Sequence, residues 1–508
     1  MTPGPAPPGI SDSAGLPTPA IAFDRPASDV VVRFDQRVPL DAAALLTLRA
    51  TGATVDTTDV SRLEAGRDWW PLTVGWAVDG MVPGRPSAIV RPDDAAQVAS
   101  VLRACNHLGI PVTAAGGRSG VCGASIPVFG GVTLDMGALT GIVDVDDQSL
   151  LVTVRPGTFG DQFETELRAE HRLTLGHWPQ SISISTVGGW LACRSAGQYS
   201  TRYGKIEDMV VGLEVAMADG RLIRTGSGGP RSATGPDLTQ LFVGSEGTLG
   251  IITEAKLRVH PAPQAELRAG YGFASFAAGL DACRRILRRG ATPAVLRLYD
   301  QVESARTFAI DDSCALVVVD EGDPGLVQAT MTVVAEECGD ADPLDEAHVR
   351  NWLEHRNQIA SLESLSRAGL VVDTVEVAAA WSVLPSLFDQ TVAALVDLEG
   401  TLAASAHQSH AYTDGACLYF TFAGRPAAGE ADSYYQAAWN VVMQRALAHG
   451  AAISHHHGIG LNRGSYLPAA LGGAFDVLAA CKAVLDPAGI LNPGKLGLPS
   501  PFGEPPWP

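Results

Sequence analysis

Residues 244–253, Gly-Ser-Glu-Gly-Thr-Leu-Gly-Ile-Ile-Thr, decide the fold of this chain because they have a partner far upstream. The partner is residues 111–120, Pro-Val-Thr-Ala-Ala-Gly-Gly-Arg-Ser-Gly, a second glycine-rich loop that also lies against a β-type run. Glycines let successive backbone N–H groups turn inward and form a nest for an anion. The downstream loop ends in Ile251 and Ile252, an apolar pair suited to a flat ring. Together the loops predict a site that holds one extended anionic cofactor along its length.

Each loop taken alone also fits an ordinary tight turn, because glycine supplies positive φ wherever a chain bends sharply. Residues 116–120, Gly-Gly-Arg-Ser-Gly, are a weak signal by themselves. Neither loop is the Gly-x-Gly-x-x-Gly fingerprint of Rossmann units or the Gly-x-x-x-x-Gly-Lys-Ser/Thr of P-loops. A nicotinamide site or a nucleotide triphosphatase therefore has no sequence support, and the paired loops with their apolar end predict a flavin.

The composition narrows the class of protein. The 508 residues suit two or three domains, and a hydrophobic share of 46% is enough for substantial cores. A net charge of −19 without a Lys/Arg run argues against nucleic-acid binding. The eight cysteines are widely spaced without a Cys-x-x-Cys pair, which argues against a zinc ribbon or disulfide scaffold and favours a cytoplasmic location. We see no secretory signal, no bilayer-spanning apolar run and no peroxisomal address.

Further segments extend the loop pattern in chain order. They are His177-Trp-Pro-Gln-Ser-Ile-Ser-Ile-Ser-Thr-Val-Gly-Gly189, Ser195-Ala-Gly197, Tyr203-Gly204 and the closing Asp486-Pro-Ala-Gly-Ile-Leu-Asn-Pro-Gly-Lys495. With the two loops, they resemble the FAD-linked oxidase, or vanillyl-alcohol oxidase, superfamily over roughly residues 65 to 495. The resemblance implies an α+β fold, with a two-subdomain FAD-binding domain of vanillyl-alcohol oxidase type plus an α+β substrate (cap) domain.

The resemblance also implies which residues hold FAD. They are Pro111, Ala115, Gly116, Gly117, Arg118, Ser119, Gly120, Pro179, Ser181, Ser185, Thr186, Gly188, Gly189, Ser195, Gly197, Tyr203, Glu246, Gly247, Gly250, Ile251 and Ile252. Covalent flavin occurs in the superfamily through His or Cys. Because the upstream loop has no His and Cys122 lies just beyond it, we expect non-covalent FAD that denaturation releases.

The chain is expected to divide into four segments: an N-terminal arm over 1–65, the FAD-binding domain over 66–262, the cap domain over 263–452, and a segment over 453–508 that returns to the FAD domain. Residues 1–28 are rich in Pro, Gly, Ala and Ser and are expected to be disordered or loosely draped.

Local patterns predict several elements. Strand Ala88–Pro92, helix Ala95–Leu108 capped by Asp93 or Asp94, and strand Ile110–Thr113 lead into the upstream loop. Polar turns predict hairpins over 142–154 and 211–224. In the cap, helices are expected over 387–398, with Pro385 as a start signal, and over 433–449, with the strand Leu418–Phe422 between them.

Three consecutive histidines, His455, His456 and His457, precede Gly458-Ile-Gly460. On an extended strand consecutive residues alternate faces, so at most two of them would share one pocket. They lack the i,i+4 spacing of a helical zinc site. One interpretation is a solvated loop or half of a metal site. The one we favour is imidazoles beside the flavin, acting as a base or electrostatic partner near neutral pH.

Residues 412–422 predict a strand in which Cys417, Tyr419 and Thr421 share one face. Tyr419 is either a core tyrosine with a bonded hydroxyl or a phenol that moves a proton during catalysis. The catalytic interpretation needs a pKa for Tyr419 below the usual value of about 10, which a nearby cation could produce.

Both segments look like one branch of the superfamily, alkylglycerone-phosphate synthase. That branch carries Tyr-x-x-Gly-Ala-Cys-x-Tyr-Phe and Ser-His-His-His-Gly-x-Gly, matched here by residues 412–420 and 454–460. The resemblance implies that Tyr419 is catalytic and, through a Gly-His-x-Pro-x-Ser segment, implicates His177. A Leu-Arg-Leu-x-Asp match contains Arg297, which we expect to be structural and paired with a carboxylate.

In that branch an arginine binds the anionic head of the substrate. The candidate here is Arg356 in His355-Arg-Asn357, with Arg367 as the weaker one, because the flanking residues match the branch poorly. An arginine fork suits carboxylate or phosphate equally, and the plain alternative is a surface salt bridge.

A second branch, the D-2-hydroxyacid dehydrogenases, carries a His-x-Gly-Asp-Gly-Asn-x-His metal segment. The comparable residues here, 410–419, lack the second His and the Asn. We therefore expect no bound metal. A metal site formed by His410 together with His455–His457 stays open as the alternative.

Two enzyme hypotheses share this site. In the first, Tyr419 removes a proton next to the ketone of an acyloxy ketone phosphate, a carboxylate leaves, and a long-chain alcohol replaces it without net redox. In the second, a hydroxyl-bearing carbon delivers hydride to FAD while Tyr419 or a histidine takes the proton and Arg356 holds the acid group. A non-catalytic flavin-binding protein is the third hypothesis. The expected partners are a small or lipid-like anionic substrate and a second copy of the chain in a homodimer, with peripheral membrane contact left open.

Overall fold

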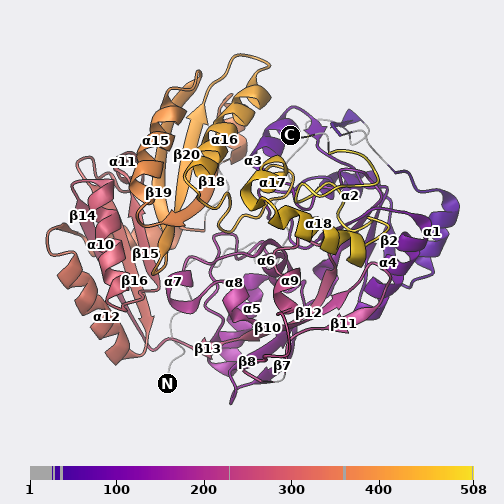
Figure 1. Cartoon of the computed structure of the whole chain (residues 1–508), viewed down its shortest axis with the longest axis horizontal. Helices are drawn as coiled ribbons and strands as arrows, with labels where there is room; N and C mark the ends of the chain where they lie inside the picture. The colour runs from indigo at the N-terminus through magenta and orange to yellow at the C-terminus, as the bar shows by residue number, and fades with distance from the viewer. Residues whose placement is uncertain are drawn as a thin grey trace.

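The computed structural model describes residues 26, 29–34, 38–227, 229–357, 362–505 and 507 of the chain. The predicted loose segment, residues 1–28, lies mostly outside the described residues. Helices and strands mix in two lobes, and the C-terminal helices lie back against the N-terminal lobe (Figure 1). The predicted α+β class is confirmed.

The first sheet leads into the upstream glycine loop. Three strands run parallel, with one antiparallel strand at the edge: β5 (Val112–Ala115), β6 (Val132–Asp135), β4 (Ala88–Arg91) and β2 (Thr54–Asp56). Helix α4 (Ala95–Leu108) joins β4 to β5 and has the predicted bounds. The Asp94 carboxylate accepts the N–H of Gln97 at its start, and Gly109 ends it with a left-handed φ of 64°.

The second sheet is antiparallel, in the order β11-β10-β12-β8-β7. Its strands are β7 (Ile142–Asp146), β8 (Leu151–Val154), β10 (Val210–Ala216), β11 (Leu222–Arg224) and β12 (Ile251–Arg258). Both predicted hairpins are confirmed. Because β12 begins at Ile251, the downstream glycine loop lies directly at the start of its central strand.

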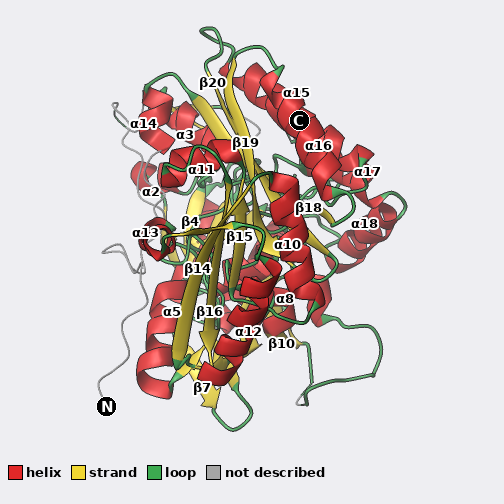
Figure 2. Cartoon of the chain, turned by 90° about the vertical axis from the view of Figure 1, so that its left-hand side faces the viewer, coloured by secondary structure: helices red, strands yellow, loops and turns green. Residues whose placement is uncertain are grey.

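The third sheet has seven antiparallel strands in the order β17-β14-β16-β15-β19-β20-β18. They are β14 (Ala265–Phe273), β15 (Val295–Tyr299), β16 (Cys314–Gly322), β17 (Asp342–Leu344), β18 (Val371–Ala380), β19 (Thr401–Ala411) and β20 (Gly415–Gly424). Figure 2 shows α10 (Phe276–Arg288) and α12 (Pro324–Glu337) lying over one face of this sheet.

The alternation along β20 separates the core of this lobe from the site. Leu418, Phe420 and Phe422 are fully buried in one cluster with α10, α15 (Leu384–Val396) and α16 (Ala431–Ala448). The opposite face of β20 carries Cys417, Tyr419 and Thr421, as predicted, and this face is turned away from those helices.

The other helices and short strands connect these sheets. They are β1 (Val31–Val32), α1 (Ala42–Arg49), α2 (Asp59–Glu64), α3 (Pro71–Val78), β3 (Met81–Val82), α5 (Gly160–Glu166), β9 (Leu173–Thr174), α6 (Val187–Cys193), α7 (Ser200–Tyr203), α8 (Ile206–Met209), α9 (Thr239–Phe242), β13 (His260–Pro261), α11 (Gln301–Phe308), α13 (Glu346–His355), α14 (Leu362–Arg367), α17 (Leu467–Leu471) and α18 (Ala474–Leu485).

The closing segment of the chain lies beside the first sheet. The N–H of Val112 in β5 donates to the carbonyl of Ile490 at 2.8 Å, and the carbonyl of Val112 accepts the N–H of Asn492 at 2.8 Å. These two bonds extend the edge of the sheet at β5 and bring residues 490–492 next to the upstream glycine loop.

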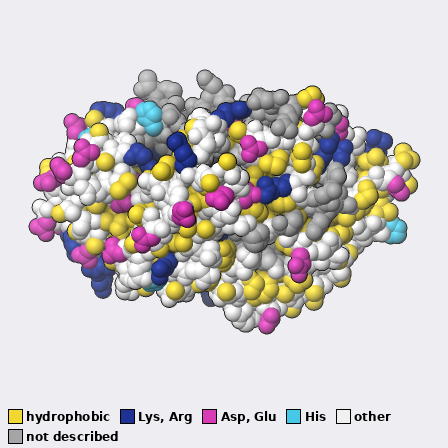
Figure 3. All heavy atoms as spheres, turned by 90° about the horizontal axis from the view of Figure 1, so that it is seen from above, with side chains coloured by type: hydrophobic (Ala, Val, Ile, Leu, Met, Phe, Trp, Pro, Cys, Tyr) yellow, Lys and Arg dark blue, Asp and Glu magenta, His cyan; other side chains and the backbone are white. Residues whose placement is uncertain are grey.

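In the described part of the chain, no individual helix has the length and apolar character needed to cross a bilayer. Two neighbouring helical stretches meet the length and apolarity criteria only when they are taken together. They are Gly464–Leu471 and Ala474–Leu485, and the chain is bent by 119° between them. On the face seen in Figure 3, acidic and basic side chains are interspersed rather than gathered in a basic band.

Candidate active site

A cavity of about 310 Å³ lies between the two glycine loops. Most of the predicted cofactor residues line it: Ala115, Gly116, Gly117, Arg118, Ser119, Gly120, Pro179, Ser181, Ser185, Thr186, Gly188, Gly189, Ser195, Glu246, Gly247, Gly250, Ile251 and Ile252. Three predicted residues lie outside this lining. Pro111 accepts the N–H of Val132 at the start of the sheet, Gly197 packs against Trp178, and the hydroxyl of Tyr203 donates to Glu321.

The wall of this cavity fits FAD. A Cβ atom on Gly117 would lie 1.9 Å from the carbonyl oxygen of Ile184, and one on Gly116 would lie 2.4 Å from the Thr186 hydroxyl oxygen. Only glycine therefore lets the loop lie this close to the segment opposite. Trp69 and Ser125, which also line the cavity, have buried polar atoms without a hydrogen-bond partner in the described structure, as expected where a polar ligand would supply one.

Buried hydrogen bonds hold the downstream loop against both neighbouring segments. Glu246 has a left-handed φ of 51°, and its carboxylate accepts the N–H groups of Ile459 at 2.6 Å and Gly460 at 2.9 Å. The side-chain amide of Asn492 donates to the carbonyls of Ala124 at 2.9 Å and Glu246 at 2.7 Å. The closing segment therefore fastens the downstream loop to the segment that follows the upstream loop.

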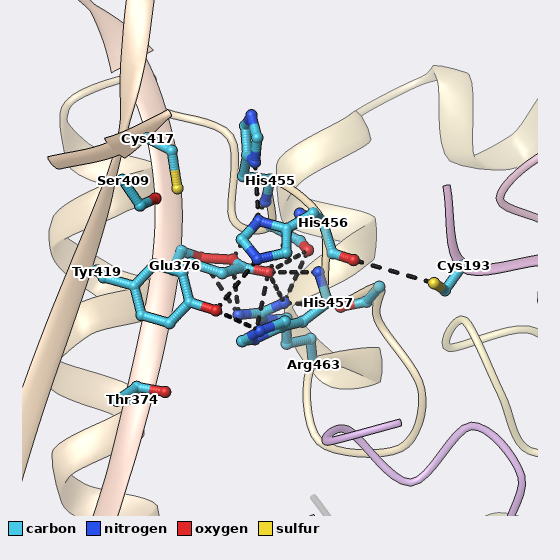
Figure 4. A network of polar contacts seen from close by, with 12 residues as sticks. Cys193, Thr374, Glu376, Ser409, Cys417, Tyr419, His455, His456, His457 and Arg463 are labelled. Atoms are coloured by element: carbon cyan, nitrogen blue, oxygen red, sulfur yellow. Dashed lines mark hydrogen bonds and ion pairs between the residues drawn. The ribbon is translucent and has the colours of Figure 1, made fainter. Parts of the chain in front are cut away.

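One end of the cavity is polar and is formed by the cap sheet and the histidine segment. It is lined by Arg297, His410, Tyr419, His456 and His457. The hydroxyl of Tyr419 lies 3.1 Å from Nε2 of His456 and 2.5 Å from Nε2 of His457 (Figure 4). His455 lies behind this pair, with Nδ1 2.8 Å from Nδ1 of His456. Two of the three histidines thus share the pocket, which agrees with the predicted limit.

The backbone around the histidines is a series of bends rather than the extended strand that the prediction assumed. The cause is Glu376 on β18, whose carboxylate is fully buried and accepts the N–H groups of His455 at 3.1 Å, His456 at 3.3 Å and His457 at 2.6 Å. Arg463 forms an ion pair with the same carboxylate at 2.9 Å and is itself fully buried. One carboxylate therefore folds the segment and turns the rings of His456 and His457 toward Tyr419 (Figure 4).

Burial keeps the tyrosine and the histidines of this polar end neutral. Burial, reinforced by Glu376, raises the pKa of Tyr419 well above its usual value. Burial lowers the pKa of His455 and of His457 to about 4 each, and that of His456 well below its usual range. The expectation of a lowered pKa for Tyr419 is therefore wrong, because desolvation outweighs the nearby Arg297 and Arg463. Near neutral pH the wall presents a phenol and uncharged imidazoles.

His177 does not line the cavity. It is buried, its Nε2 lies 2.8 Å from the hydroxyl of Ser195, and its ring packs on Trp190 with centroids 4.7 Å apart. Burial lowers the pKa of His177 to about 3. The side chain therefore supports Ser195, which does line the cavity, from behind.

Two arginines approach the polar end in different ways. Arg297 lines the cavity, and its Nη2 donates to Nε2 of His407 at 2.5 Å. His407 in turn donates from Nδ1 to Glu303 at 2.7 Å, so the structural partner of Arg297 is an imidazole and not the carboxylate that was predicted. Arg356 is buried outside the lining, donates to Gln198 at 2.8 Å, and lies 4.9 Å above the ring of Tyr199.

Sequence reasoning missed the residues that organise this wall. Glu376 and Glu303 were not singled out, and neither were Arg463 and His407. The available signal for Glu376 was a single charge within the otherwise apolar run Val375–Ala380. Arg367, the weaker candidate for the anion, forms an ion pair with Glu363 at 2.8 Å on α14 and does not line the cavity.

Comparisons with known proteins agree with this architecture. Residues 86–226 match the family described as FAD binding domain, and residues 262–496 match FAD linked oxidases, C-terminal domain. The FAD-linked oxidoreductase YgcU of Escherichia coli O157:H7 is 31% identical over 433 residues, which cover 81% of this chain and 89% of that protein. Alkyldihydroxyacetonephosphate synthase of Dictyostelium discoideum is 30% identical over 456 residues, covering 82% of this chain and 74% of that protein.

A solved structure of alkyldihydroxyacetonephosphate synthase superposes with a TM-score of 0.78. It is 25% identical, and the match covers 94% of this chain and 89% of that one. The similarity in fold therefore extends over the flavin lobe, the cap sheet and the closing segment.

Proposed function

This chain belongs to the FAD-linked oxidases, and from that premise we propose that it exchanges an acyl group for an alkyl group on an acyloxy ketone phosphate, as an alkylglycerone-phosphate synthase does. In this exchange a carbon–oxygen bond breaks and a carboxylate leaves, while the oxygen of a long-chain alcohol forms the new carbon–oxygen bond and gives up its proton. The exchange involves no net oxidation. FAD, the cofactor of the family, supplies the reactive ring when bound.

The observation that carries the proposal is the position of the Tyr419 hydroxyl. It lies in the cavity wall within hydrogen-bond distance of two imidazoles, His456 and His457, and burial keeps all three groups uncharged. The phenol oxygen can accept a proton from the carbon next to the ketone while an imidazole takes the phenolic proton. The transfer from the phenol to an imidazole joins atoms that are already in contact, as general acid–base catalysis requires.

The phosphate group of the substrate is assigned to Arg297. Its Nε is buried without a hydrogen-bond partner in the described structure, while His407 fixes its Nη2. Arg356 adds positive charge from behind, since both guanidinium groups lie close to the ring of Trp352, at 5.8 and 5.9 Å. A guanidinium held by one nitrogen and open at another suits a phosphate oxygen.

The competing reaction is hydride transfer from a 2-hydroxy acid to the same cofactor. It would use the same wall, with Tyr419 or an imidazole taking the hydroxyl proton and an arginine holding the carboxylate. The exchange is favoured because a relative named for that synthase aligns over 82% of this chain and a structure of such a synthase shares its fold.

Anaerobic mixing separates the two reactions. We expect release of fatty acid from acyl-dihydroxyacetone phosphate that depends on added long-chain alcohol, and no bleaching of the flavin by 2-hydroxy acids. Bleaching by a 2-hydroxy acid without acyl release would overturn the exchange in favour of oxidation. Absence of both, in protein saturated with FAD, would leave only a flavin-binding protein.

Three further expectations remain predictions: non-covalent attachment of FAD, a cytoplasmic location and a homodimer. Acid precipitation checks the first, because non-covalent flavin passes into the supernatant. Cys122 and Cys193 both line the cavity, so colour that stays with the pellet would direct attention to these two thiols.

A further inference from the structure

Four side chains near the polar end of the cavity form a cluster that the proposed reaction does not use as a unit. His410 and Cys417 are cross-strand partners on β19 and β20, whereas His455 and His456 come from the returning segment. One ligand atom from each of the four lies within 4.8 Å of the others. Figure 4 shows Cys417, His455 and His456 gathered above the ring of Tyr419.

Hydroxyl groups hold one nitrogen of each imidazole in this cluster. Three contacts do so: Ser409 Oγ with His410 Nδ1 at 2.7 Å, Tyr412 OH with His455 Nε2 at 3.0 Å, and Tyr419 OH with His456 Nε2 at 3.1 Å. The nitrogens that remain are His410 Nε2 and the two Nδ1 atoms of His455 and His456, which face each other at 2.8 Å. Outer hydrogen bonds of this kind fix the ring orientation and tautomer of metal-binding histidines.

One of these inner nitrogens has no partner. His410 is 3% exposed, and its Nε2 is buried without a hydrogen bond in the described part of the chain. The thiol of Cys417 is fully buried beside it, with a weak 3.9 Å contact to the carbonyl of Leu418 and a hydrogen bond with Ser409. A buried nitrogen left unpaired is costly, so its position indicates a ligand that completes it.

We propose that His410, Cys417, His455 and His456 bind one Zn²⁺ ion. Three imidazole nitrogens and one thiolate are a tetrahedral donor set that suits zinc, and four protein ligands leave no open position. Ligand atoms around tetrahedral zinc lie about 3.3–3.8 Å apart. Zinc binding would therefore shorten the widest separation in the cluster, 4.8 Å, by about 1 Å, and would slightly lengthen the 2.8 Å separation between the two Nδ1 atoms. The expectation of no metal rested on the missing His and Asn of another motif, whereas these ligands form a different set.

The ion would act by position rather than by contact with substrate. It would tie the β19–β20 hairpin of the cap to the returning segment. It would also fix the ring of His456, whose outer nitrogen contacts Tyr419. The zinc site does not depend on whether the enzyme catalyses acyl exchange or hydride transfer. In either reaction His457 would be the imidazole that accepts the phenolic proton, because Nε2 of His456 carries a hydrogen when Nδ1 binds the ion.

The test measures metal in the FAD-loaded protein. We expect about one zinc per chain by mass spectrometry of the metal after purification without chelators or metal-affinity resins. Cys417→Ser and His410→Gln should each lower that content at least tenfold, while Cys481→Ser, a half-buried thiol far from the cluster in sequence, should keep it. Replacement by Co²⁺ should give tetrahedral d–d absorption at wavelengths beyond the flavin bands in the wild-type protein and in Cys481→Ser.

Two results would overturn the site. One is wild-type protein with full FAD that holds no zinc and gives no cobalt bands after incubation with either ion. The other is zinc retained equally by both cluster variants, which would place the ion on other side chains. Because metal content and the cobalt spectrum are read without substrate, failure of the acyl-exchange assay leaves this test unaffected.

Discussion

At the scale of single residues, the hydroxyl of Tyr419 is the atom on which the proposed proton transfer depends. Tyr419→Phe removes the contacts with His456 and His457 but leaves the ring stacked on His407, with centroids 5.0 Å apart. We expect the variant to keep FAD and to lose turnover by about 10²–10⁴-fold, the usual contribution of a positioned acid or base. Turnover and flavin absorbance measured on the same sample check this.

The matched control is Tyr466→Phe. Tyr466 is only partly buried and its hydroxyl makes one weak contact, 3.4 Å from Asn440, away from the cavity. This variant should turn over at the wild-type rate. A Tyr419→Phe enzyme that also works at a near-normal rate would remove the phenol from the mechanism.

The two arginines make separable contributions to anion binding. Arg297→Ala removes the guanidinium that lines the cavity, whereas Arg356→Ala removes one that reaches the cavity only through Gln198. A lost charge-assisted hydrogen bond costs about 1.5–3 kcal/mol, so we expect Arg297→Ala to raise KM for the phosphate substrate about 10–100-fold. Arg356→Ala should raise KM less. Steady-state kinetics at saturating FAD decide the order, and a larger effect at Arg356 would assign the anion to that residue.

At the scale of elements, the upstream glycine loop binds FAD only if it can lie close to the segment opposite. Gly117→Ala would place a Cβ atom 1.9 Å from the carbonyl of Ile184, an immovable backbone atom, so the loop must shift. We expect at least a tenfold loss of FAD affinity, read by fluorescence titration of the apoprotein. Gly473→Ala is the control, since a Cβ there meets nothing within 4 Å and the backbone φ is −60°. Equal affinities in the two variants would contradict a close fit at this loop.

Helix α4 and helix α15 show how far local sequence determines an element. Asp94 and Gly109 mark both ends of α4, and its bounds agree with the prediction because both signals lie next to the helix they terminate. Helix α15 begins at Leu384 rather than at residue 387, because Pro385 lies inside the first turn, where its missing N–H costs nothing.

The histidine segment shows where local sequence fails. His455 is shaped by Glu376, a residue 79 positions away on another strand, and no periodicity encodes that contact. The same long-range burial reversed the expected pKa direction of Tyr419, because the prediction considered a nearby cation and not the loss of solvent. The pattern therefore singled out Tyr419 and the histidines that line the cavity, but not Glu376, and not the geometry and charge of the group.

At the scale of the whole molecule, a few buried polar contacts join the segments that surround the cavity. The ion pair between Glu376 and Arg463 links the cap sheet to the returning segment, and both side chains are fully buried. Asn492 links the downstream glycine loop to Ala124, just beyond the upstream one. Because these partners lie far apart in the chain, the cavity forms only when both lobes and the closing segment are folded together.

Glu303 connects α11 to two strands of the cap sheet and makes the stability of the molecule depend on pH. Its carboxylate accepts hydrogen bonds from Ser405 at 3.0 Å, Thr421 at 2.9 Å and His407 at 2.7 Å. Burial opposes its ionisation, but His407, the Arg306 guanidinium at 3.4 Å and Thr421 outweigh burial and hold the pKa of Glu303 at about 2. The lowered pKa means that the folded state binds this proton less readily than the unfolded chain, whose glutamate titrates near 4.3.

The ionised Glu303 therefore adds about 3 kcal/mol to the free energy of unfolding above about pH 5, and this contribution is lost as the pH falls toward 2. We expect Glu303→Gln to lower the unfolding free energy at pH 7, and its difference from wild type to shrink by about 2 kcal/mol at pH 3. Urea unfolding at matched FAD concentration measures both values. Glu399→Gln, an exposed glutamate, should differ little from wild type at either pH. A gap between Glu303→Gln and wild type that stays constant from pH 7 to pH 3 would show that this carboxylate is not held ionised by its neighbours.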